Sequence, residues 1–186
     1  MTLTIFALAA LALLVSPGPT NTLLFVSGAG AGVRASLRLI PAEIAGYLTV
    51  IVPLALFGRP YLAAHPKLEQ AVAVAASLWV LYLAFSLWRA PRDEAARAVS
   101  FRRVLFTTMM NPKALVIALV LLPPPEKAAD LVPPLSIFAA LVLFVASGWI
   151  AAGAGIGRAT GKGHLLRRVA AGYLVFVAAM VFAKVV

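Results

Sequence analysis

Two short motifs place prolines and polar residues inside otherwise apolar stretches of the sequence. The first reads SPGPTNT from residue 16, and the second reads MNPKA from residue 110. Proline removes a backbone donor and clashes with the preceding turn, so each motif is expected to interrupt a helix. The N–H groups that open the second half of a broken helix carry partial positive charge and can bind an anion. The chemistry that these motifs could support is therefore the binding of a small charged group.

Eight residues of these motifs form the candidate substrate-binding and transport set. In the second motif, Asn111 suits an N-cap and Pro112 suits the first helical position. In the first motif, Thr20, Asn21 and Thr22 stand where caps and substrate contacts are expected. The candidate residues are Pro17, Gly18, Pro19, Thr20, Asn21, Asn111, Pro112 and Lys113.

Lys113 lies near the middle of an apolar stretch, where a cation in a membrane helix costs about 2.5–3.5 kcal/mol. It therefore needs a partner, a water-filled cavity or an anionic ligand. Glu43 is the only acidic residue inside any of the long apolar segments. It could pair with Lys113, carry a coupling proton, hold a substrate ammonium, or lie near the membrane surface in contact with headgroup water.

The composition indicates that these residues are carried by a membrane protein. Of 186 residues, 63% are hydrophobic and 12% are charged, with a mean hydropathy of +1.01, whereas soluble domains carry about 25% charged residues. The absence of cysteine excludes disulfides, thiolate catalysis and thiolate metal sites. The net charge of +10 is explained by basic cytoplasmic loops more simply than by binding to nucleic acid.

The hydrophobic pattern predicts an all-α integral membrane protein with six transmembrane helices in a single domain, residues 1–186. The first segment is anomalous, because residues 3–15 would rise only about 20 Å as helix and residues 3–32 about 45 Å. A crossing made of two half-helices accounts for both lengths. The six segments are Leu3–Gly32, Leu39–Phe57, Ala71–Trp88, Val104–Leu122, Leu135–Ile156 and Val169–Val186.

The two proline motifs also indicate an internal repeat. Pro19 and Pro112 lie 93 residues apart, which is half of the chain. Each half then holds three spans, residues 1–95 and 100–186, and begins with a broken helix. Because three is odd, the second half must be inverted relative to the first. Inverted repeats whose broken helices meet at mid-membrane are a recurring plan of secondary transporters.

The basic residues predict the orientation. Those in the loops after spans one, three and five outnumber those on the opposite side, so these loops should face the cytoplasm and both termini should lie outside. A re-entrant first segment would instead place the N-terminus inside, and this alternative stays open. The eleven cytoplasmic residues are Arg34, Arg38, Arg89, Arg92, Arg97, Arg102, Arg103, Arg158, Lys162, Arg167 and Arg168, against Arg59, Lys67, Lys127 and Lys184.

Taken in order along the chain, the motifs resemble those of the LysE/RhtB-type amino-acid exporters, which are bacterial inner-membrane proteins. The resemblance rests on PGP with Asn21 after it, on NPKA from residue 111, on LWVLYLAFSLWR and on GYLVFVAAMVFA. It implies export of amino acids or related zwitterions from the cytoplasm by proton exchange. The chain is shorter than is usual in that family. Its fifth span has no acidic residue, which favours a neutral substrate over a basic one.

No other chemistry is expected. The sequence shows no catalytic pair of a nucleophile and a general base, no group of metal ligands and no cofactor motif, so an enzyme is not predicted. The expected partners are the lipid bilayer and a small amino-acid-like substrate, with the formation of a homo-oligomer left open. The competing hypothesis is a structural or regulatory membrane subunit that transports nothing.

Overall fold

The computed structural model describes residues 2–58, 99–123 and 125–160, together with isolated positions between 67 and 88 and between 168 and 179. Within this part of the chain every regular element is helical. The predicted third and sixth spans, 71–88 and 169–186, lie largely outside the described residues. The six-helix inverted repeat, with repeats 1–95 and 100–186, therefore stays a prediction.

The first apolar segment is broken where the sequence predicted. Helix α1 spans Leu3–Val15 and helix α2 spans Pro19–Ala31, and the two are bent by 58°. The break comprises Ser16, Pro17 and Gly18. Pro17 and Pro19 lack the N–H groups that would have bonded the carbonyls of residues 13 and 15, so the helical ladder cannot continue.

The fourth apolar segment is broken in the same way. Helix α7 spans Phe101–Met109, and helix α8 spans Pro112–Val116 and continues as the π-helical segment η2, Ile117–Leu121. The bend across this break is 47°. Both predicted interruptions are thus confirmed.

The remaining elements are longer or serve as connections. Helix α3, Val33–Leu37, leads into α4, Ile40–Pro53, and the π-helical segment η1, Leu54–Gly58. The 3₁₀ segment η3, Ala128–Leu131, leads into α9, Val132–Thr160. By length and composition, Val33–Gly58 and Ala128–Gly157 could each cross a membrane, and the described part holds up to four such spans if each bent pair counts as one.

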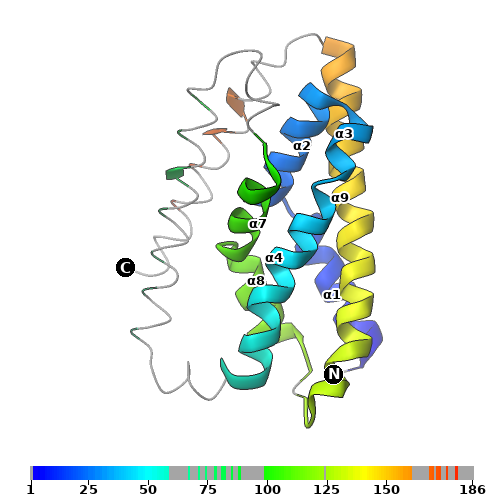
Figure 1. Ribbon diagram of the computed structural model, residues 1–186, viewed down its shortest axis with the longest axis vertical. Helices are drawn as coiled ribbons and strands as arrows, with labels where there is room; N and C mark the ends of the chain where they lie inside the picture. Colours follow the sequence, from blue (N-terminus) through cyan, green and yellow to red (C-terminus); the bar gives the residue numbers. More distant parts are fainter. Residues whose placement is uncertain are drawn as a thin grey trace.

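The two bent pairs run in opposite directions. In Figure 1 the chain passes upward through α1 and α2 and downward through α7 and α8. The contacts agree, since α2 packs on α7 and α1 packs on η2. Figure 1 also places α3, the start of α7 and the end of α9 at one end of the molecule, as the sorting of basic residues by loop requires. These elements carry Arg34, Arg102, Arg103 and Arg158.

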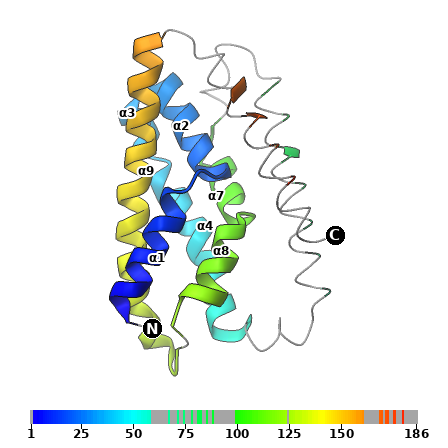
Figure 2. The same cartoon turned by 180° about the vertical axis from the view of Figure 1, so that it is seen from behind.

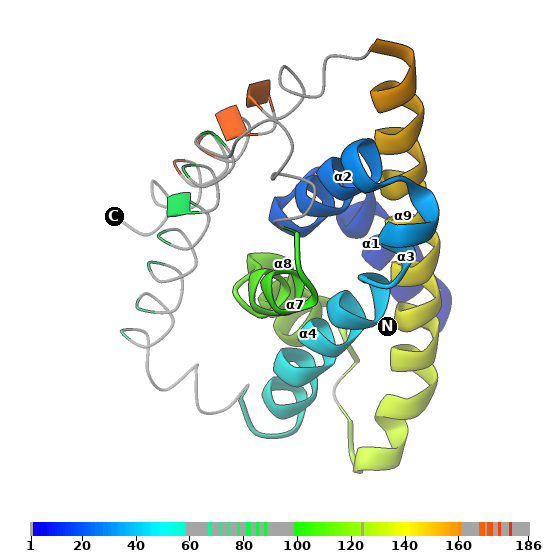
Figure 3. The same ribbon diagram turned by 45° about the horizontal axis from the view of Figure 1, so that its top comes forward.

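Helices α2 and α4 lie in the middle of the described structure. Figure 3 shows α9 along one side of them and α7 with α8 on the other. From behind, the break between α1 and α2 is seen beside α7 (Figure 2). Each break has a buried side, with Gly18 and Pro19 at the first and Asn111 at the second, while Pro17 and Met110 are exposed.

The buried apolar residues form two clusters. One, here called the α2 cluster, is contributed by α2, the first turn of α4, the start of α7 and the second half of α9. The other, the α1 cluster, is contributed by α1, the later turns of α4, α8 with η2 and the first half of α9. Along each of α1–α2, α4 and α7–α8, buried polar residues stand at the boundary between the clusters: Thr20 and Asn21, Glu43, and Thr108, Asn111 and Lys113.

Helices α2 and α9 pack with their backbones in close approach, which small residues at the contact allow. A Cβ on Gly28 would lie 2.2 Å from the carbonyl oxygen of Ile150, and one on Gly153 would lie 2.0 Å from that of Phe25. Gly32 differs from them. It has φ 80° and ends α2, so it serves the turn rather than the packing.

We expect Gly153→Ala to destabilise the protein and Gly155→Ala to leave it as stable or more stable. The first methyl would force α9 away from the backbone of α2, and overpacking of this kind costs about 1–3 kcal/mol. The second meets nothing within 4 Å, and alanine is the better helix former. Thermal unfolding of the purified proteins in detergent measures both. Equal midpoints for the two variants would contradict the close approach.

Candidate functional site

The end of α1 leaves backbone carbonyls that side chains must satisfy. The hydroxyl of Ser16 donates to the carbonyl of Leu13 at 2.7 Å. The amide Nδ2 of Asn21 donates to the carbonyls of Leu14 at 2.8 Å and Ser16 at 3.0 Å. Asn21 therefore folds back from the first turn of α2 and fastens α2 to the end of α1.

Lys113 comes from the other broken pair and reaches the same carbonyls. Its ammonium Nζ donates to the carbonyl of Leu14 at 3.4 Å and to that of Ser16. The side chain is only 8% exposed. The partner that a buried lysine requires is thus the C-terminal end of α1, where the helix dipole favours a positive charge.

A chain of hydrogen bonds links the two breaks directly. Asn111 Nδ2 donates to Thr20 Oγ1 at 3.2 Å, and Thr20 Oγ1 lies 3.2 Å from Thr108 Oγ1. Because the Thr108 hydroxyl donates to the carbonyl of Val104 at 2.9 Å, the Thr20 hydroxyl must donate to Thr108. Each hydroxyl then donates once and accepts at least once, and the direction of the whole chain is fixed.

The expected helix caps are confirmed at one break and wrong at the other. Asn111 is the N-cap of α8, with its side chain accepting from the N–H of Lys113 at 3.1 Å, and Pro112 occupies the first turn. At α2 the N-cap is Gly18, without a side-chain hydrogen bond, and Pro19 follows it. Thr20, Asn21 and Thr22 lie inside the first turn. Their side chains bond across the breaks or, for Thr22, back to the carbonyl of Gly18.

Gly18 leaves room for the ammonium of Lys113. A Cβ on Gly18 would lie 3.0 Å from Cε and 3.2 Å from Nζ of Lys113. The backbone of Gly18 is extended, with φ −172° and ψ 174°, and this conformation is open to any residue. The requirement for glycine here is therefore space.

Glu43 is buried, which rules against one of the four alternatives for this residue, a carboxylate in contact with headgroup water. It lies in the first turn of α4, is 2% exposed, and its Oε2 has no hydrogen-bond partner. Its charge and that of Lys113 interact, but no salt bridge joins these two described residues. Tyr47, one turn further along α4, is buried beside it and stacks edge-on against Phe138, with ring centroids 5.3 Å apart.

The sequence-based reasoning missed three contributors to this site. Two are the backbone carbonyls of Leu14 and Ser16, which no residue-type pattern reveals. The third is Thr108, whose signal was a threonine pair just before the second break in an apolar segment. No group of three or more potential metal ligands occurs among the described residues.

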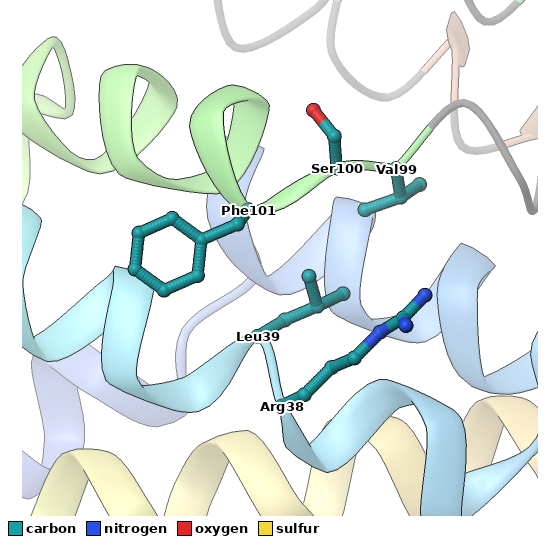
Figure 4. Close-up of a pocket in the computed structure, with 5 residues that line it drawn as sticks. All are labelled: Arg38, Leu39, Val99, Ser100 and Phe101. Carbon is teal, nitrogen blue, oxygen red and sulfur yellow. The ribbon is translucent and has the colours of Figure 1, made fainter.

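A pocket of about 340 Å³ opens at the arginine-rich end of the molecule, away from the predicted set. It lies between the turn that joins α3 to α4 and the residues that lead into α7. Figure 4 shows the Arg38 side chain extending along one side of it below Val99, while the Phe101 ring turns away. The lining residues are Arg38, Leu39, Val99, Ser100 and Phe101.

Comparisons with protein-family models, with curated proteins and with solved structures each found no match to this chain.

We expect Thr20→Val to destabilise the protein by about 1–3 kcal/mol, because it leaves the buried donor of Asn111 and acceptor of Thr108 unsatisfied. Thr49→Val is the matched control. Thr49 is exposed on α4 and its hydroxyl bonds only within its own helix, to the carbonyl of Ala45. Chemical or thermal unfolding in detergent compares the two. A Thr20→Val protein as stable as Thr49→Val would argue against the hydrogen-bond chain between the breaks.

Proposed function

We propose that this protein is a secondary transporter that exports amino acids or related small zwitterions from the cytoplasm. One observation supports this most directly: two broken helices meet through Thr20, Asn111 and Lys113 in a polar layer between two apolar clusters. Irregular backbone within a membrane is tolerated where it is buried in protein or lines a cavity. Transporters place substrate and coupling-ion sites at such breaks.

The proposed architecture is six transmembrane helices in two inverted three-helix repeats, with helices 1 and 4 broken at mid-membrane. The opposite directions of the α1–α2 and α7–α8 pairs support it. So does the collection of arginine-bearing elements at one end, which we assign to the cytoplasmic side. The resemblance to the LysE/RhtB-type exporters supports the proposal that this membrane is the bacterial inner membrane.

The substrate we propose is a zwitterion that carries no net charge. Lys113 offers a cation for its carboxylate, while the polar layer contains one carboxyl group, that of Glu43. A dibasic amino acid would bring a second positive charge beside Lys113 with a single acid to balance it. A buried unpaired charge is costly, so such a substrate is disfavoured.

Glu43 is the proposed carrier of the coupling proton. A carboxyl group buried with an unbonded Oε2 can exchange a proton without dismantling a hydrogen-bond network. The charge that acts on it is that of Lys113 from α8, and Glu43 in turn acts on Tyr47 of its own helix. The proton and the Lys113 charge are therefore coupled electrostatically across the polar layer.

A non-transporting structural or regulatory subunit is the second candidate. It is favoured by the fact that Lys113, Asn21 and Asn111 all have protein partners, so these three side chains need no ligand to be satisfied. A transport assay separates the two candidates, because a structural subunit would move no substrate.

We expect proteoliposomes containing the wild-type protein to release labelled neutral amino acids such as alanine, and to release lysine or arginine much more slowly. The reason is the charge balance of the polar layer. Liposomes with Lys127→Ala serve as a control, since Lys127 is exposed in the turn before η3. No release of any amino acid under an imposed proton gradient would favour the structural subunit.

We expect Glu43→Gln to abolish release driven by a proton gradient and to keep exchange of labelled for unlabelled substrate without a gradient. The amide matches the neutral carboxyl in shape but cannot bind or release the coupling proton. Glu126→Gln, on an exposed residue, is the matched control. If both modes of transport are lost, Glu43 binds substrate instead. If gradient-driven release persists, Glu43 is not the proton carrier.

A further inference from the structure

The carbonyls at the end of α1 form a small site that is rich in hydrogen-bond acceptors. Leu14 and Ser16 each present one oxygen, and each oxygen accepts from both Asn21 and Lys113. A carbonyl oxygen has two lone pairs, so these four bonds use the full capacity of the pair. Half of that capacity is taken up by an ammonium group that belongs to another helix.

We propose that these two carbonyl oxygens are a binding site for a primary ammonium group. Lys113 fills the site in the conformation seen here, and the ammonium of a substrate fills it when Lys113 leaves.

The site favours an ammonium group for two reasons. The C-terminal end of a helix carries partial negative charge, which stabilises a cation there. Both oxygens also need N–H donors, and a primary ammonium supplies three. A quaternary ammonium has the charge without the donors, so it would leave both carbonyls half satisfied.

The Lys113 side chain, which fills the site, is able to move away from it. Lys113 reaches α1 through a flexible stem from α8, whereas Asn21 is held in the first turn of α2, close to the carbonyls it bonds. The ammonium lies over Gly18, which has no side chain to hold it in place. The end of α1 thus has one fixed donor and one that can swing away.

This mechanism rests on the proposed transport function in its last step. When a zwitterion enters, its ammonium can take the carbonyls and its carboxylate can pair with the released Lys113. One ammonium replaces another at α1, so the charge at that point does not change. The exchange selects amino acids with a free primary amine and rejects betaines, whose nitrogen has no hydrogen.

Chemical rescue of Lys113→Ala tests the site without a transport assay. The substitution removes three carbons and the ammonium, which is the shape of n-propylammonium. We expect the purified variant in detergent to unfold at a lower temperature than wild type. Millimolar n-propylammonium should then raise its midpoint by on the order of 3 °C. Propanol and tetramethylammonium should not.

Two controls accompany the rescue. Wild type should show no shift with n-propylammonium, because its own Lys113 fills the site. Lys127→Ala, which removes an exposed lysine, should behave as wild type. Equal shifts in all three proteins, or equal rescue by propanol, would overturn the proposal, since either result would mean that the amine acts elsewhere or as a space-filling solute.

A second pair of variants covers the case in which Lys113→Ala does not fold. Gly18→Ala should lower the midpoint of the protein that carries Lys113, because the methyl group displaces the ammonium. The same change should have little effect in a Lys113→Leu background, which ends at Cδ and so lacks both Cε and the ammonium. Additive effects of the two substitutions would contradict the proposed site.

The transport step has its own readout. Release of labelled alanine should be inhibited by excess unlabelled alanine and not by glycine betaine. Inhibition by the betaine would overturn the ammonium assignment while leaving export intact. If no amino acid is released but n-propylammonium still rescues Lys113→Ala, the proposed export function is contradicted while the proposed ammonium site is supported.

Discussion

The structure depends on satisfying the backbone carbonyls of Leu14 and Ser16, which the end of α1 leaves free. Pro17 and Pro19 prevent the helix from continuing, and the surrounding cluster of Phe6, Ala10 and Leu14 is apolar. An unsatisfied carbonyl in such surroundings costs several kcal/mol. The donors come from Asn21 within the same pair and from Lys113 in the other. The first break is therefore completed by the second, and neither bent pair has its polar groups satisfied alone.

The position of the polar layer follows from this dependence. Apolar contacts between α1 and α9, between α2 and α9 and between α4 and α7 hold the helices on either side of it. Gly28 and Gly153 bring the backbones of α2 and α9 close together. The hydrogen bonds that join the two breaks are made by the side chains of Lys113, Thr20 and Asn111, which lie between the two apolar clusters.

The sequence predicted the features that local chemistry determines. Proline placed both breaks, and the rule for N-caps identified Asn111, because such effects act within one helical turn. It did not reveal the partner of Lys113, since backbone carbonyls are present at every residue and only the fold decides which are free. The surroundings of Glu43 were likewise left open by the sequence. The sequence shows how far Glu43 lies along its helix from the expected membrane surface. Which neighbouring helices cover it is decided by the tertiary structure. The third and sixth spans remain sequence-based predictions.

Lys113 shows that a side chain with protein partners can still be proposed for a functional role. In the first turn of α8 its charge is disfavoured by the dipole of its own helix, yet its ammonium lies at the end of α1, where the dipole favours it. The charge of Lys113 is stabilised by the place that its ammonium reaches, not by the position of the residue in α8. It would persist if any other primary ammonium took the same carbonyls. A lysine serving structure alone gains nothing from a replaceable partner, whereas one serving transport needs a stable position to occupy when no substrate is present. The same two hydrogen bonds meet both requirements, because the group that Lys113 presents to α1 is the group that an amino acid also carries.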